Sequence, residues 1–229
     1  MPSAARFICL TDQAEGSAMK KKHLYALAVL FIILAAGALS FGMSRQRGSV
    51  LVRASHAVGS SDIICYLQSD PDWAEDFLGT SSYTMKSSGC LTTCLTATLQ
   101  YEGIMPESIT GAADSIDPGA LNSFLSKEQV YDSEGNIQWD PLENALNITA
   151  VRQDADGITG KSLEKLLAKH IYPIVRVRVN GSGSFHYILI VYSDGKEFWC
   201  MDPMNRSDSL VPLSDFGNRI YAVRYIFRE

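Results

Sequence analysis

Hydrophobic and polar positions divide the chain into a long apolar run, a polar stretch of small residues and a patterned remainder. Residues 24–43 are 20 positions without a charge, about the length that a helix needs to cross a bilayer core. Lysines occupy positions 20–22 just before this run, so the positive-inside preference places the N-terminus in the cytoplasm. Arginines 45, 47 and 53 beyond the run weaken this orientation without reversing it.

A cleaved signal peptide is the alternative to a membrane anchor. Residues 36–38, Ala-Gly-Ala, resemble the small-residue site of a signal peptidase. Either interpretation carries the remainder of the chain across the membrane. We therefore expect a domain outside the cytoplasm, either anchored by a single span or secreted.

Four segments are expected from these boundaries. Residues 1–19 form a leader that ends at a second methionine, Met19, which we interpret as the true start. Residues 20–43 are the membrane or signal segment, 44–61 a linker, and 62–229 the folded domain.

The domain begins with helical spacing and ends with apolar runs typical of strands. Apolar residues recur at helical intervals in five places: 72–77, 90–101, 118–127, 138–146 and 163–170, the last behind Ser162 as N-cap. Strand patterns follow at 171–179, 186–192, 196–202 and 219–227. Helices first and an antiparallel sheet second predict an α+β fold.

A hairpin is predicted where the strands around residue 194 meet. Ser193-Asp194-Gly195 suits a three-residue loop with Gly195 in the left-handed conformation. This loop pairs Tyr192 with Lys196 and places His186 opposite Asp202, with Cβ atoms roughly 5 Å apart on one face. A two-residue turn would shift the register by one and separate the two side chains. We favour the three-residue loop.

Cys90 is the strongest candidate for chemistry. It follows a Ser-Ser-Gly run and opens a predicted helix, whose unpaired N–H groups stabilise a thiolate. With His186 and Asp202 downstream, the chain contains the nucleophile, base and orienting carboxylate of a cysteine hydrolase. We expect Asp202 to bind one imidazole nitrogen and leave the other facing Cys90.

Charge excludes one class of partner. From residue 55 onward there are 13 basic and 23 acidic side chains, a net charge of −10, whereas the preceding residues carry +5. An acidic domain argues against nucleic-acid binding, which requires a basic face. The remaining partners are a peptide or protein substrate and, through the apolar segment, a membrane.

Five cysteines occur, and Cys9 lies in the leader. The others, Cys65, Cys90, Cys94 and Cys200, have no zinc-knuckle spacing, so we expect no metal and no cofactor. A zinc site of Cys90, Cys94, Cys200 and His186 is disfavoured because it lacks a second close ligand pair. We interpret Cys94 and Cys200 as small buried apolar residues.

Five short segments resemble the double-glycine, bacteriocin-processing family of papain-like cysteine peptidases: 67–73, 88–90, 136–139, 185–187 and 201–203. The resemblance spans about residues 63–227. It implies a papain-like fold, with a helical half carrying Cys90 packed on an antiparallel sheet.

The resemblance also implies roles for four residues in peptide-bond hydrolysis. Cys90 is the nucleophile, His186 the general base and then acid, and Asp202 orients His186. Gln68 and the backbone N–H of Cys90 form the oxyanion hole. Gln68 lies 22 residues before Cys90, whereas many papain-like enzymes place this glutamine only a few residues upstream.

Three functions fit these residues. The first is a membrane-tethered or secreted thiol peptidase acting on peptides or on peptide cross-links of the cell envelope. The second is a catalytically inactive peptide-binding module of the same fold. The third is a transglutaminase-like acyltransferase, which uses the same three residue types.

Overall fold

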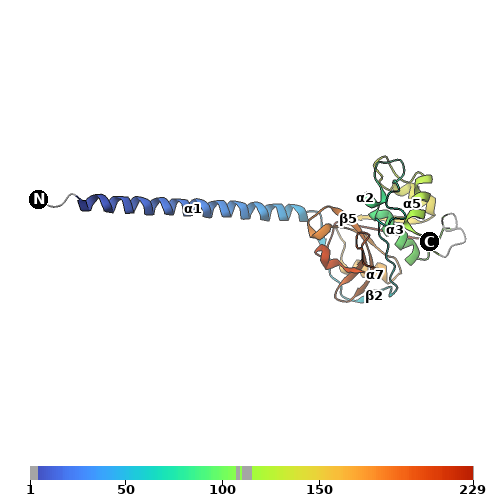
Figure 1. The fold of residues 1–229 in the computed structure, drawn as a ribbon. Helices are drawn as coiled ribbons and strands as arrows, with labels where there is room; N and C mark the ends of the chain where they lie inside the picture. Colours follow the sequence, from blue (N-terminus) through green and yellow to red (C-terminus); the bar gives the residue numbers. More distant parts are fainter. Residues whose placement is uncertain (1–4, 107–108, 110–114, 229) are drawn as a thin grey trace. The chain divides into compact units, whose positions relative to one another are not determined.

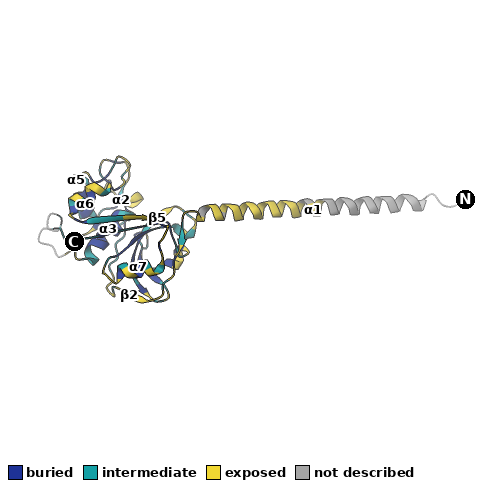
Figure 2. Ribbon diagram, turned by 180° about the vertical axis from the view of Figure 1, so that it is seen from behind, coloured by how far each residue is buried: buried dark blue, intermediate teal, exposed yellow. Residues whose placement is uncertain are grey.

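The computed structural model describes residues 5–106, 109 and 115–228. The chain separates into two compact units, Met1–Arg47 and Gly48–Glu229. The first unit contains helix α1 (Ala5–Gln46). Within it, His23–Phe41 has a mean hydropathy of 2.5 and is long and apolar enough to cross a membrane. The described side chains of this stretch are exposed (Figure 2), so an anchor or signal remains our prediction for residues 20–43.

The second unit combines helices with antiparallel sheets (Figure 1). The larger sheet has the order β3–β9–β4–β5–β6–β7, and β2 pairs with the end of β5. Its strands are β2 (Ala57–Gly59), β3 (Thr149–Asp154), β4 (Ile174–Arg178), β5 (Phe185–Asp194), β6 (Phe198–Met201), β7 (Val211–Pro212) and β9 (Ala222–Phe227). A small second sheet pairs β1 (Val50–Leu51) with β8 (Arg219–Ile220).

The helices lie where the apolar spacing predicts them, except that α2 was not predicted and that two further differences are described below. They are α2 (Met85–Ser88), α3 (Cys90–Tyr101), α5 (Pro118–Lys127), α6 (Trp139–Leu146) and α7 (Gly160–Leu167), with short 3₁₀ turns η1 (Val179–Gly181) and η2 (Leu213–Phe216). The start of α5 follows from its sequence, because Asp117 accepts a hydrogen bond from the backbone N–H of Ala120 and Pro118 fits the first helical position.

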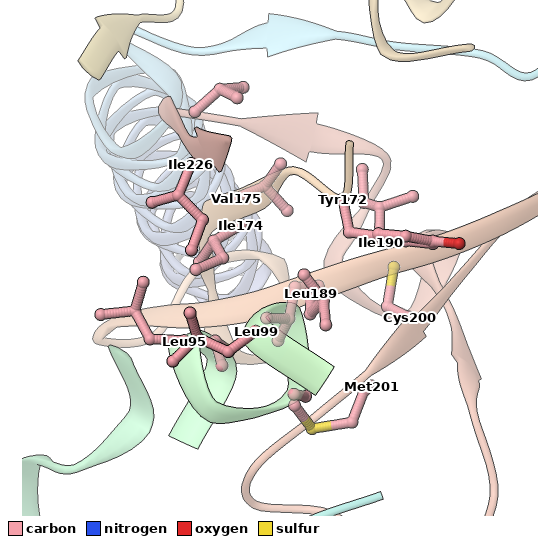
Figure 3. Packing of buried hydrophobic residues seen from close by; sticks show 14 of the residues in the cluster. Leu95, Leu99, Tyr172, Ile174, Val175, Leu189, Ile190, Cys200, Met201 and Ile226 are labelled. Carbon is pink, nitrogen blue, oxygen red and sulfur yellow. The ribbon is translucent and has the colours of Figure 1, made fainter. Parts of the chain in front are cut away.

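Helix α3 packs against β5 and forms the centre of the core. Leu95 and Leu99 of α3 lie against Leu189 of β5 and Ile174 of β4, and all four side chains are fully buried (Figure 3). Burying each such side chain contributes about 1.5–3 kcal/mol. The helix that begins at Cys90 is therefore fixed against the strand that carries His186.

Residues 50–59 correct the prediction of a tether. The composition of residues 44–61 predicts a linker, but residues 50–51 and 57–59 form β1 and β2, which pair with β8 and β5. Gly59 permits the second pairing, because a Cβ there would lie 2.5 Å from the Val191 carbonyl oxygen. Glu164 of α7 also accepts hydrogen bonds from Ser55 and His56. The folded unit therefore begins near Gly48 and not at residue 62.

Three further expectations differ from the structure. Residues 72–77 do not form the predicted helix, because 72–75 form turns and Phe77 pairs with Thr84 in an isolated bridge. The helix predicted at 163–170 runs from Gly160 to Leu167 with Thr159 as N-cap, because Ser162 supplies the third residue of a capping box. Strand β3 was not predicted: three of its six side chains are exposed, so it lacks a continuous apolar run.

Glu102, at the end of α3, generates a prediction about stability. Its Oε1 accepts the Tyr172 backbone N–H at 3.0 Å, but burial raises the pKa of this carboxyl from 4.5 to about 8. Between pH 4.5 and about 8 the folded state keeps a proton on Glu102 that the unfolded chain releases. The contribution of Glu102 to stability is therefore fully present below pH 4.5 and is lost as the pH rises through about 8.

We expect Glu102→Gln to remove the loss of stability at high pH. Chemical unfolding at pH 5 and pH 9 should show the variant gaining roughly 1–3 kcal/mol at the higher pH relative to the unsubstituted protein. Glu128→Gln, an exposed carboxyl at the end of α5, is the matched control and should change nothing. Equal pH dependence in Glu102→Gln and the control would contradict the prediction.

Candidate active site

Cys90 is placed by a close contact between two consecutive helices. Helix α3 begins at Cys90, as its sequence predicts, and only Gly89 separates it from α2. The Gly89 N–H donates to the Met85 carbonyl oxygen at 2.7 Å. A Cβ on Gly89 would lie 2.5 Å from that oxygen and 2.8 Å from the buried Met85 Sδ. Close packing, and not an unusual φ angle, therefore explains the glycine before the cysteine.

The β5–β6 hairpin has a different register from the one predicted. Tyr192 lies opposite Trp199 and Ser193 opposite Phe198, so Lys196 belongs to the loop and His186 is not directly opposite Asp202. The Asp194 side chain accepts the backbone N–H groups of Lys196 and Glu197, each at 2.8 Å, which lengthens the turn. Gly195 does adopt the predicted positive φ, at 88°.

A bulge at Val191 places Asp202 on the same face of the sheet as His186. Beyond it, Ile190 lies opposite Cys200 and Leu189 opposite Met201, so the next pair along the ladder is Ile188 and Asp202. Residues two apart on a strand share a face, and therefore Asp202 remains on the side of His186 as a diagonal neighbour. Without the bulge, Asp202 would lie opposite Leu189 and on the other face.

The structure brings Cys90, His186 and Asp202 together. Nε2 of His186 lies 2.6 Å from Oδ1 of Asp202, and the Cys90 side chain is near enough to the ring to raise its pKa. Because Asp202 occupies Nε2, Nδ1 is left for the thiol, which is the division of the two nitrogens that the sequence predicts. His186 is only 3% exposed.

The electrostatics favour a charged imidazole. Burial lowers the pKa of His186, but the hydrogen bonds to Asp202 and Cys90, with the negative charges of these groups, raise it from 6.5 to about 9. The ring is therefore an imidazolium at neutral pH. A backbone N–H, from Met204, also donates to Oδ1 of Asp202 at 2.8 Å and fixes this carboxylate.

Gln68 lies between the segments that lead into and out of the site. Its backbone N–H donates to the Pro203 carbonyl oxygen at 2.9 Å, and Nε2 donates to the Lys86 carbonyl oxygen at 2.8 Å. The side chain is buried, and Oε1 has no partner among the described residues. Its role as an oxyanion donor remains a prediction, since no contact between Gln68 and Cys90 defines it.

The other cysteines lie outside this constellation. Cys94 and Cys200 are fully buried, as expected, and burial raises the pKa of both thiols well above its ordinary value. Burial and the charge of Asp208 likewise raise the pKa of Cys65. Among the described residues no cluster of ligands could hold a metal ion.

A cavity of about 180 Å³ lies beside Cys90, with walls that include Ile137, Trp139, Tyr187 and Arg224. Arg224 was not among the residues predicted for the site, although a charged residue within the otherwise apolar run 222–227 was a usable signal. A larger cavity of about 490 Å³ follows β2, but it contains none of the candidate residues and no charged side chain.

Replacing Gly89 should disturb the site through packing. We expect Gly89→Ala to cost about 1–3 kcal/mol of unfolding free energy, because the new methyl group meets backbone that cannot move freely. Chemical denaturation measures this change. Gly37→Ala in α1, where no atom lies within 4 Å, is the control, and equal stability of the two variants would refute the packing explanation.

The His186–Asp202 bond predicts a pH effect. Because the folded pKa lies above 6.5, the stabilisation is fully present below pH 6.5 and is lost as the pH rises through about 9. In Asp202→Asn the pKa of His186 should fall well below 9, since burial then opposes a single remaining hydrogen bond. NMR titration of the imidazole measures the shift. Asp208→Asn, an exposed carboxylate in the following loop, should leave it unchanged.

Comparison with known proteins adds a distant likeness to a solved structure. No protein-family model matches the chain, and no curated protein matches it at a significant level. Among solved structures, it is similar to a candidate C39-like peptidase from Bacillus anthracis, with 14% sequence identity and a TM-score of 0.45. The match covers 76% of this chain and 100% of that chain. The chemistry of the site is therefore judged on its own residues.

Proposed function

We propose that the chain is a papain-like cysteine peptidase that hydrolyses peptide bonds outside the cytoplasm through an acyl-enzyme on Cys90. The observation that supports this most directly is the 2.6 Å contact between His186 and Asp202, beside a Cys90 side chain that raises the pKa of the same imidazole. A thiol, an imidazole and a carboxylate in this order are the parts that nucleophilic acyl transfer requires.

The first half of the reaction uses the charged form of His186. The Cys90 thiolate attacks the scissile carbonyl carbon, and His186 donates its proton to the amine that leaves. A pKa of about 9 keeps that proton on the imidazole at neutral pH, so the acid is ready before the substrate binds. The products are a free amine and a thioester on Cys90.

The second half uses the neutral ring. His186 takes a proton from a water molecule as the water attacks the thioester, and the released Cys90 thiolate and a carboxylic acid complete the cycle. Asp202 stabilises the imidazolium and holds the ring in one orientation, as its bond to Nε2 requires. The base therefore needs no rearrangement between the two halves.

Gln68 is our candidate for an oxyanion donor. Its Nε2 carries two protons, and the Lys86 carbonyl takes one of them. The second proton would stabilise the tetrahedral oxyanion together with the backbone N–H of Cys90. The two hydrogen bonds that hold Gln68 between residues 86 and 203 fix the position of this amide.

The proposed location of the catalytic unit outside the cytoplasm is based on helix α1. The apolar stretch His23–Phe41 would tether the catalytic unit to a membrane or serve as its export signal. Peptides or peptide cross-links of the cell envelope are then the accessible substrates.

Alkylation tests the reactivity of Cys90. Iodoacetamide at pH 7, followed by peptide mapping, should modify Cys90 in preference to the other cysteines of the full-length protein. His186→Ala should slow this modification at least about tenfold, because the stabilising imidazolium is lost. Cys65 is the internal control, and its slower reaction should not change.

A peptide library then separates the three candidate functions. Cleavage by the full-length chain but not by Cys90→Ser would support the peptidase, whereas incorporation of an amine into a glutamine substrate would identify an acyltransferase. A Cys90 that iodoacetamide does not modify would overturn both enzymes and leave a binding module.

A further inference from the structure

Four arginines share one face of the sheet. Arg152 of β3 lies directly opposite Arg224 of β9, and Arg224 in turn lies opposite Ile174 of β4. Directly opposed residues share a face, as do residues two apart on one strand. Arg176 and Arg178 of β4 therefore lie on the same face as Arg152 and Arg224.

The charges of these arginines are not compensated within the protein. None of the four forms an ion pair with a carboxylate in the part of the chain that the structure describes. Asp154 lies on the same face, opposite Ala222, yet it is exposed and forms no ion pair with them. Like charges directly opposite one another destabilise a sheet, so the Arg152–Arg224 pair costs stability in the unliganded protein.

The guanidinium groups of the four arginines contact aromatic rings and not carboxylates. The guanidinium groups of Arg152 and Arg224 each lie 5.9 Å from the ring centre of Trp139. Those of Arg176 and Arg178 lie 4.5 and 4.0 Å from that of Phe185. Stacking on a ring holds a guanidinium in place and leaves donors at its edge for a ligand.

Several donors on this face have no partner. The Nε atoms of Arg176, Arg178 and Arg224 are buried and make no hydrogen bond to the described residues. Nη1 of Arg224 donates to the Val223 and Gln153 carbonyl oxygens, which fixes the group without neutralising it. Leaving buried charged donors unpaired costs free energy in the unliganded protein.

This face leads into the active site. Arg224, Trp139 and Tyr187 line the cavity that contains Cys90. Arg176 lies opposite Tyr187, and Arg178 lies opposite Phe185, the residue before His186. Arg224 therefore lies in the wall of that cavity, while Arg176 and Arg178 lie beside the strand that carries the proposed base, on the face opposite to His186.

We propose that this arginine-lined face binds carboxylates of an acidic peptide substrate, with Arg224 engaging the one nearest the scissile bond. The proposal rests on the proposed peptidase function and specifies its substrate class. Arginine pairs with carboxylates through two parallel hydrogen bonds, and stacking on Trp139 holds Arg224 ready for them. A nucleic acid is disfavoured, because the region from residue 55 onward carries a net charge of −10.

Binding to a variant that cannot turn over is the direct test. The probes are paired peptides that carry either glutamate or glutamine, each with a free or an amidated C-terminus. Titration calorimetry with full-length Cys90→Ala should show the glutamate peptides binding at least about tenfold more tightly, with a preference that falls as salt rises. A preference set by the free C-terminus alone would overturn the assignment to side-chain carboxylates.

Substitutions then show which arginine produces the preference for glutamate peptides. In the Cys90→Ala background, Arg224→Gln should abolish it, Arg224→Lys should retain part of it, and Arg224→Glu should favour lysine peptides. Arg53→Gln, an exposed arginine between β1 and β2 that lines none of the cavities described, is the matched control and should keep the full preference. If Arg224→Gln fails to fold, Arg152→Gln, which removes an exposed member of the set, should still reduce the preference severalfold.

The outcomes separate this inference from the proposed function. Equal binding of glutamate and glutamine peptides, or a preference that survives Arg224→Gln in a folded protein, would overturn the inference. Cleavage of peptides without regard to their charge would do the same and leave the peptidase intact. A preference for acidic peptides without cleavage would retain this surface and overturn the peptidase.

Discussion

The hydrogen bond between His186 and Asp202 holds the site in its working arrangement, and it depends on a single irregularity in the sheet. The bulge at Val191 shifts the β5–β6 register by one residue between the turn and the site. Because side chains alternate along a strand, that shift returns Asp202 to the face of His186. The bond then raises the pKa of the imidazole and leaves its other nitrogen for Cys90.

The two halves of the site are fixed by different forces. Apolar packing of α3 against β5 sets the position of Cys90, with Leu95, Leu99 and Leu189 fully buried (Figure 3). Polar contacts position the partners, since Asp202 accepts hydrogen bonds from His186 and from the Met204 backbone. Packing thereby supplies the stability, and the hydrogen bonds supply the orientation that acyl transfer requires.

Charge distribution gives the domain two distinct surfaces. Its overall excess of acids repels polyanions, yet four arginines on the face beside Cys90 form no ion pair with any carboxylate of the described residues. A cluster of positive charge on this acidic domain lowers the stability of the fold, because opposed like charges and unpaired donors are both destabilising. This cost is the basis of our proposal that an anionic substrate supplies the missing charge.

The sequence by itself determined the local features that short-range physics controls. Helices α3 and α5 begin and end where the spacing of apolar residues and the Asp-Pro start predict, and Cys90 opens its helix. The association of Cys90, His186 and Asp202 was also predicted, but through a register that proved wrong by two residues near the site. The error preserved the face only because an even shift does not alter the alternation of side chains.

Tertiary structure decided everything that depends on contacts between distant segments. The Asp194 side chain lengthened the turn, Val191 bulged, and residues 50–59 joined the sheets although their composition is that of a linker. Arg152 and Arg224 stand 72 positions apart in the sequence, so no local pattern reveals that they are opposed. Strand pairing across such separations depends on how the whole domain packs. The local pattern of residues along a single sequence does not specify which strands become neighbours.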